Sequence, residues 1–64
     1  MITVNGKKVE VENLQLSELL TQMDLANQLC AVEVNKILVP HKERDACKLQ
    51  DGDIVEIVTL VGGG

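Results

Sequence analysis

Apolar and polar residues alternate over the first eleven positions of the chain, which is the pattern of strands with one buried face. Ile2 and Val4 alternate with polar residues, and Val9 and Val11 do so again. Asn5-Gly6 lies between the two runs, and this dipeptide favours a type I′ turn because both residues tolerate a positive φ. The pattern predicts a β-hairpin whose apolar face another element must cover.

A helical pattern follows the predicted hairpin. Its apolar residues recur at i, i+3, i+4 and i+7, at Leu16, Leu19, Leu20 and Met23. Gln15 stands at the N-cap position with Glu18 three residues later, which is an imperfect capping box. We expect the helix to end near Asp24, and Met23 to fill a gap in the core as flexible methionine side chains do.

The middle of the chain alternates again. Residues 30–34 place Val32 and Val34 on one face, and Asn35-Lys36 predicts a turn. The short apolar run 37–39 follows, and Pro40 stops it because proline cannot donate to a sheet ladder. These residues predict a second pair of strands, the second of them short.

The last third begins with a polar connection, residues 41–48, that has room for one helical turn. Leu49 is expected to reach the core from it. Asp51-Gly52-Asp53 predicts a turn, and the β-branched run 54–59 predicts the final strand. In that strand we expect Val55 and Ile57 to face the helix.

If the short strand 37–39 is not counted, the predicted order is ββαββ, an α+β arrangement. If the last strand pairs in parallel beside the first, one helix can lie across one face of a mixed sheet, which is the β-grasp (ubiquitin-like) fold. Sixty-four residues leave no room for a second domain. We assign residues 1–61 to the β-grasp domain and residues 62–64 to a flexible glycine tail.

Charge and composition exclude several functions. Six Lys and Arg against ten Asp and Glu give a net charge of −4, and the chain has no Phe, Tyr or Trp, so it offers neither a basic stripe nor stacking rings to nucleic acid. A chain this short has little interior for a ligand pocket, which usually takes about 300–1,000 Å³. A self-sufficient enzyme and a bound cofactor are therefore not expected.

Cysteine usage and the apolar runs indicate a cytoplasmic protein without a membrane span. Cys30 and Cys47 cannot form a disulfide framework, and with His41 they fall short of the four ligands of a closed zinc site. We expect two reduced thiols, with Cys30 in the core and Cys47 more accessible, and an exposed His41. No signal peptide precedes the first strand, and no apolar run approaches the ~20 residues that a bilayer span needs.

The candidate chemistry lies at residues 60–64. Leu60 and Val61 follow the final strand, and then Gly62, Gly63 and Gly64 end the sequence. Glycines bury no side chain and lose the most entropy on ordering, so they do not serve stability. They place a thin carboxylate on a rigid domain, where a partner could activate it with ATP as an acyl-adenylate and pass it to sulfur or to an amine.

A docking surface for such a partner is predicted beside the tail. If Val55 and Ile57 face inward, then Glu56 and Val58 face outward and Leu60 continues that row. Val58, Leu60 and Val61 would form a small apolar patch of the kind found at interfaces. The acidic residues Asp51, Asp53 and Glu56 could steer a basic partner surface.

Several segments together resemble the ThiS family of sulfur carrier proteins. They are the turn 50–53 (QDGD), the strand 55–58 (VEIV), the segments 32–35 (VEVN) and 37–40 (ILVP), and the terminal 61–64 (VGGG). The resemblance covers the whole chain. It implies that the Gly64 carboxylate is adenylated by an E1-like, ThiF-type adenylyltransferase and converted to a thiocarboxylate with sulfur from a cysteine desulfurase or another donor. Thiazole synthase (ThiG-type) would then take the sulfur for the thiazole ring of thiamine.

In that family Gly63 and Gly64 form the terminal pair, and Gly62 extends the run. Three alternatives remain open from the sequence, and one of them is a plain interaction module with an inert tail. The small subunit of molybdopterin synthase shares the fold and the Gly-Gly end, although it is usually longer and richer in aromatic residues. A ubiquitin-like modifier would instead end as an isopeptide on lysine.

Overall fold

The computed structural model describes residues 1–11 and 13–60. Its elements, in chain order, are β1 (Ile2–Val4), β2 (Lys7–Val9), β3 (Leu14–Gln15), α1 (Leu16–Gln22), β4 (Cys30–Val34), β5 (Ile37–Leu38), the 3-10 helix η1 (His41–Glu43), β6 (Lys48–Leu49) and β7 (Ile54–Thr59). All the elements predicted from the sequence are present, and two short strands, β3 and β6, are additional.

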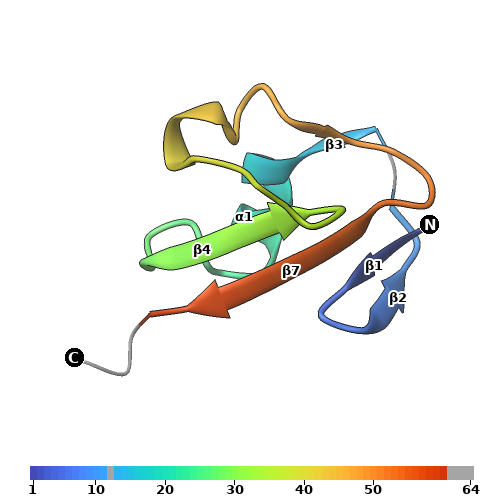
Figure 1. Cartoon of the computed structure of the whole chain (residues 1–64), viewed down its shortest axis with the longest axis horizontal. Coiled ribbons are helices and arrows are strands. Elements are labelled where there is room, and N and C mark those ends of the chain that lie inside the picture. Colours follow the sequence, from blue (N-terminus) through green and yellow to red (C-terminus); the bar gives the residue numbers. More distant parts are fainter. Residues whose placement is uncertain (12, 61–64) are drawn as a thin grey trace.

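The main sheet has five strands in the order β2-β1-β7-β4-β5. The last strand, β7, pairs in parallel with β1 and antiparallel with β4, and it therefore lies in the centre of the sheet (Figure 1). The predicted parallel pairing of first and last strands is confirmed, and with it the β-grasp arrangement. Residue 1 lies at one end of the molecule and the end of β7 at the other.

Two hairpin turns use the backbone conformations that their sequences favour. Asn5 and Gly6 have φ values of 49° and 85° between β1 and β2, and Asn35 and Lys36 have φ values of 52° and 68° between β4 and β5. Positive φ at both central residues is the signature of a type I′ turn, whose twist matches that of the flanking strands. Asn-Gly was the stronger sequence signal, but the Asn35-Lys36 turn reaches the same geometry.

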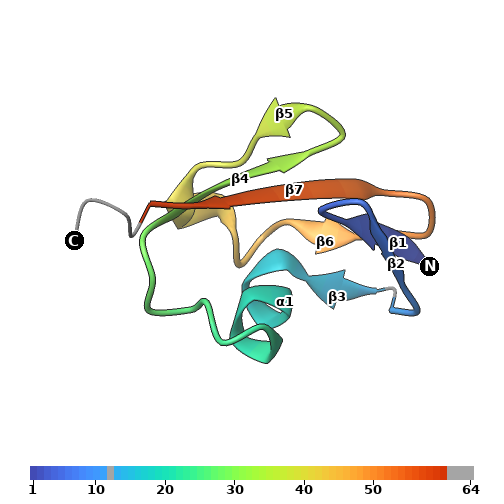
Figure 2. The same ribbon diagram turned by 90° about the horizontal axis from the view of Figure 1, so that it is seen from below.

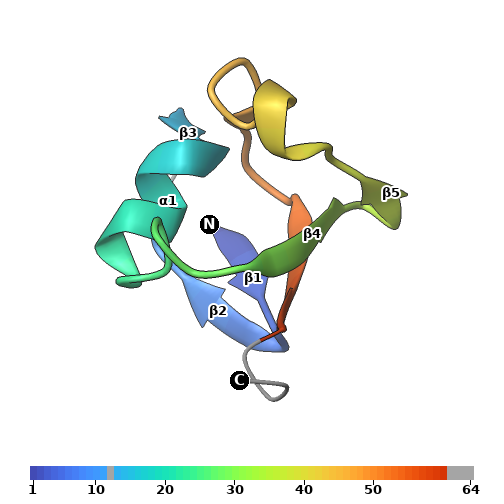
Figure 3. The same ribbon diagram turned by 90° about the vertical axis from the view of Figure 1, so that its left-hand side faces the viewer.

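Helix α1 covers one face of the sheet, together with β3 and β6 (Figures 2 and 3). At its start, the backbone N–H of Gln15 donates to the Glu18 carboxylate at 3.0 Å, which is one half of the predicted capping box. The buried core between helix and sheet consists of Ile2, Val4, Leu16, Leu19, Leu20, Cys30, Val32, Leu49, Val55 and Ile57.

Met23 does not join this core, and that prediction was wrong. The helix ends at Gln22, Met23 is the C-cap residue, and Asp24 follows with a φ of 63°. This left-handed residue turns the chain away from the helix axis. The Met23 side chain is left 38% exposed.

The polar connection before β7 is more ordered than its composition suggests. It begins with η1, as the expected helical turn, and then forms β6, which pairs with β3 in a separate two-stranded sheet. Leu49 is fully buried, as predicted, opposite Leu14 in that pair. The two-stranded sheet therefore fixes the start of α1 to the segment that leads into β7.

Candidate functional site

Strand β7 carries the chain toward the glycine residues. Hydrogen-bonded neighbours hold it on both sides, β1 along its first half and β4 along most of its length. Beyond its end, the backbone N–H of Leu60 still donates to the carbonyl of Leu29 at 2.8 Å. The chain is thus anchored up to residue 60. The predicted site residues Val61, Gly62, Gly63 and Gly64 lie outside the described residues.

The two faces of β7 differ as predicted. Val55 and Ile57 are buried under the helix, whereas Glu56 and Val58 are exposed on the opposite, uncovered face. Val58 is 59% exposed and Leu60 52%. The two apolar candidates for docking are therefore accessible to a partner.

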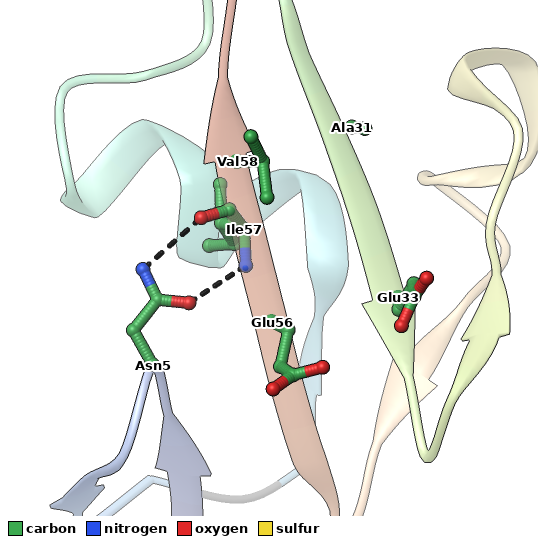
Figure 4. A pocket seen from close by; sticks show the side chains of 6 residues that line it. All are labelled: Asn5, Ala31, Glu33, Glu56, Ile57 and Val58. Atoms are coloured by element: carbon green, nitrogen blue, oxygen red, sulfur yellow. Dashed lines mark hydrogen bonds between the residues drawn. The ribbon is translucent and has the colours of Figure 1, made fainter.

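The neighbouring strands β4 and β5 add residues to this uncovered surface. We call the surface the open face, and it consists of Ala31, Glu33, Leu38, Ile54, Glu56 and Val58. Ala31 lies opposite Val58, and Glu33 lies opposite Glu56, in the β4–β7 ladder. These four residues line a shallow hollow of about 270 Å³ over β4 and β7 (Figure 4). The contributions of β4 and β5 were not predicted, because strand register cannot be read from one sequence.

Asn5 closes one side of this hollow and ties the first turn to β7. Its Oδ1 accepts from the backbone N–H of Ile57 at 2.7 Å, and its Nδ2 donates to the Ile57 carbonyl at 3.2 Å (Figure 4). The side chain thus replaces the sheet partner that β7 lacks beyond the end of β1. Sequence reasoning recognised Asn5 only as a turn residue.

Asn5→Ala is expected to lower the free energy of unfolding by about 2 kcal/mol, because it removes two hydrogen bonds and replaces asparagine, which tolerates positive φ, with alanine, which does so less well. Urea unfolding measures the change. Asn5→Gly is the matched control, since it removes the same side chain without the backbone strain, and it should cost less. An Asn5→Ala protein as stable as the natural one would contradict the bridging role.

The acidic steering residues are only partly available. The Asp51 carboxylate accepts from the Met1 amino group at 2.7 Å, and this hydrogen bond, with the positive charge, lowers the pKa of Asp51. Asp53 accepts from the Gln50 backbone N–H at 2.8 Å and from Asn35 Nδ2 at 3.0 Å. Of the three predicted acids, Glu56 is the one on the open face, where Glu33 joins it.

The cysteines are both free thiols, with Cys30 buried and Cys47 partly exposed, as expected. Burial raises the pKa of the Cys47 thiol, and the negative charge of Asp53 raises it further. A raised pKa keeps the thiol protonated at neutral pH and makes it a weak nucleophile. Cys47 is therefore not favoured as a covalent attachment point.

In the described part of the chain, no three His, Cys, Asp or Glu side chains cluster so that they could hold a metal ion. Within residues 1–11 and 13–60, no helix has the length and apolarity to span a membrane. His41 is exposed, as predicted.

Comparison with known proteins assigns the chain to a family. The model of the ThiS family matches residues 2–64, which include the whole glycine run. The chain belongs to the ThiS family. The ThiS resemblance noted in the sequence is thereby confirmed over nearly the full length.

Solved and curated relatives agree with the ThiS assignment. The crystal structure of the thiamine biosynthesis protein ThiS from Geobacter metallireducens superposes with a TM-score of 0.79, is 37% identical, and covers 98% of this chain and 97% of its own. The sulfur carrier protein ThiS of Bacillus subtilis is 35% identical, with both chains covered completely. An uncharacterized protein, ycf40, of Porphyra purpurea is 38% identical over 98% of this chain and 90% of its own length.

Proposed function

We propose that this chain is a cytoplasmic sulfur carrier protein of thiamine biosynthesis that acts as a covalent co-substrate and leaves catalysis to partner enzymes. The observation that carries the proposal is its similarity, from first residue to last, to the sulfur carrier protein ThiS of Bacillus subtilis. Membership of the ThiS family over residues 2–64 supports the same role.

The reactive group in this proposal is the Gly64 carboxylate. A carboxylate oxygen attacks the α-phosphorus of ATP on the partner adenylyltransferase, which forms an acyl-adenylate and releases pyrophosphate. A sulfur nucleophile then attacks the acyl carbon and displaces AMP. If the donor is a persulfide, two electrons from a thiol reductant free the thiocarboxylate, which donates its sulfur to the thiazole ring.

The fold favours this chemistry because β7 and the residue after it hold the chain in place up to Leu60. The strand lies in the centre of the sheet, and the Leu60–Leu29 hydrogen bond extends the anchored part beyond the strand end. Only four residues separate Leu60 from the Gly64 carboxylate. Gly62, Gly63 and Gly64 carry no Cβ that would clash in a narrow nucleotide site.

The open face, with Leu60 beside it, is the proposed docking surface for the ThiF-type adenylyltransferase and for thiazole synthase. Exposed apolar side chains on this face surround two carboxylates, Glu33 and Glu56. An apolar patch with acidic groups complements a partner surface of apolar residues flanked by Lys or Arg. The chain itself holds no cofactor in this account, since the partner binds ATP.

Val58→Asp is expected to weaken binding to the adenylyltransferase about 10-fold or more, because it buries a new charge at the centre of the interface. Calorimetric titration measures the affinity. Ile37→Asp is the matched control: Ile37 is 69% exposed, but its ladder partner Val34 shares a side of the sheet with Val55, away from Val58. Equal affinities for both variants would contradict docking through the open face.

Adenylation is tested by the exchange of labelled pyrophosphate into ATP. With the adenylyltransferase present, exchange should depend on this chain and disappear when Gly64 is deleted.

The acceptor is tested genetically, since loss of the chain should cause a thiamine requirement. A requirement for molybdenum cofactor instead would favour the molybdopterin synthase alternative, and conjugates on many cellular lysines would favour a modifier.

A further inference from the structure

Arg44 is the one charged side chain buried in the described part of the chain, with 7% of its surface exposed. It directly follows η1 and reaches toward β4. Its Nη2 donates to the Cys30 carbonyl at 2.7 Å, and its Nη1 lies 3.3 Å from Nδ1 of His41. Its Nε is buried, with no hydrogen-bond partner among residues 1–11 and 13–60.

The charge of this guanidinium is not compensated by the residues around it. The Cys30 carbonyl is a neutral acceptor, and no carboxylate of the described residues lies within ion-pair distance of Arg44. A buried cation without a counter-charge is unfavourable, and one of its N–H donors is also unpaired. An anion bound beside Arg44 would compensate its charge.

A hollow of about 390 Å³ opens beside Arg44 and His41, and the loop between α1 and β4 forms its other wall. The exposed amides of Asn27 and Gln28 lie in that wall and add N–H donors. A second hollow of about 130 Å³ shares Arg44, His41 and Ala26 with the first, and Asp45 lines it as well, although it forms no ion pair with Arg44. The buried cation thus borders open space that a small group can enter.

We propose that this hollow binds a carboxylate through Arg44. A guanidinium offers planar, paired donors that match the two oxygens of a carboxylate. The net charge of the chain is −4, so its overall electrostatic field repels anions. Affinity for a carboxylate must therefore come from this local site. The carboxylate site itself is argued without the sulfur-carrier role, and only the choice of a bound protein as the source of the carboxylate rests on that proposed function.

The position of the hollow favours an acidic side chain of a bound protein as the source of that carboxylate. Leu29 lines the hollow and accepts the hydrogen bond from Leu60, and Cys30 pairs with Thr59. The site therefore adjoins the end of β7, where a protein that engages the tail must approach. A free small carboxylate is the other source of the same chemistry.

The test is an NMR titration of the labelled protein at constant ionic strength. Acetate should produce saturable shifts at the Arg44 Nε–H and at the Leu29 and Cys30 amides, and acetamide, its neutral analogue, should not. A blocked Gly-Glu-Gly peptide is compared with Gly-Gln-Gly. Binding of the glutamyl peptide at least as tight as that of acetate assigns the site to a protein side chain, and binding of acetate alone assigns it to a free carboxylate.

Two variants decide whether Arg44 is responsible. Arg44→Gln should weaken acetate binding about 10-fold or more, because it removes the charge. If that variant fails to fold, Ala26→Glu decides, since it places a tethered carboxylate at the rim and should abolish acetate binding. Ala46→Glu, at an exposed position outside the hollow, is its control. The absence of saturable shifts with either ligand, or acetate binding unchanged by Ala26→Glu, would overturn the proposal.

Discussion

Gly63→Val is expected to reduce adenylation of this chain by at least about 100-fold while leaving its fold intact. The proposed reaction requires the Gly64 carboxylate to reach the α-phosphorus of ATP inside a partner's nucleotide site. A branched side chain next to the reacting residue would displace the carboxylate, and a displacement of about 1 Å can cost a factor of about 100. Pyrophosphate exchange with the adenylyltransferase measures the rate.

The control for this variant is Ala46→Val, which introduces the same side chain at an exposed position just before β6. It should be adenylated at the natural rate. Thermal unfolding should be unchanged in Gly63→Val, because a glycine has no side chain whose packing could be lost. Adenylation of Gly63→Val at the natural rate would mean that the tail does not enter a narrow site.

Leu49→Ala is expected to lower the free energy of unfolding by about 3 kcal/mol, the usual scale for a leucine truncated in a core. Leu49 is fully buried, and its strand pairs with β3 directly before helix α1. A core of this size rarely supplies more than about 3–5 kcal/mol in total. A large fraction of the variant should therefore be unfolded at 25 °C, as far-ultraviolet circular dichroism can show.

Leu38→Ala removes the same atoms from a leucine that is 60% exposed in β5. Its expected effect is within about 0.5 kcal/mol, as for most surface substitutions. Similar losses in the two variants would contradict the assignment of Leu49 to the core.

The sequence predicted those elements that carry a periodic pattern. The Asn5-Gly6 hairpin, the leucine stripe of α1 and the β-branched β7 each repeat their signal over several residues. The parallel pairing of β1 and β7 followed from the need of one helix to cover one sheet. These elements position the end of β7, so the platform for the tail was also predictable.

Features that depend on long-range contacts were missed. Strands β3 and β6 have two residues each, too few for a period, and they form through pairing of residues far apart in sequence. Arg44 stands in a polar run, and only the distant Cys30 carbonyl shows why it is buried. Met23 continued the apolar spacing of the helix. The helix nevertheless ends at Gln22, where the left-handed Asp24 terminates it, so Met23 lies outside it.

Part of the candidate site was predictable in the same way. The outward row of Glu56 and Val58 followed from alternation along one strand, whereas Glu33 and Ala31 required the register of β4. Gly64 was identified by its chemistry and by resemblance to the ThiS family, and its role remains a proposal.

The intact mass of this chain after incubation with ATP, the adenylyltransferase and a sulfur donor tests the central claim most directly. The account predicts a mass gain equal to the exchange of one oxygen for sulfur, located at Gly64 by fragmentation. Omission of ATP should prevent the gain. An unchanged mass under the complete conditions, with the adenylyltransferase shown to be active, would contradict the sulfur-carrier function.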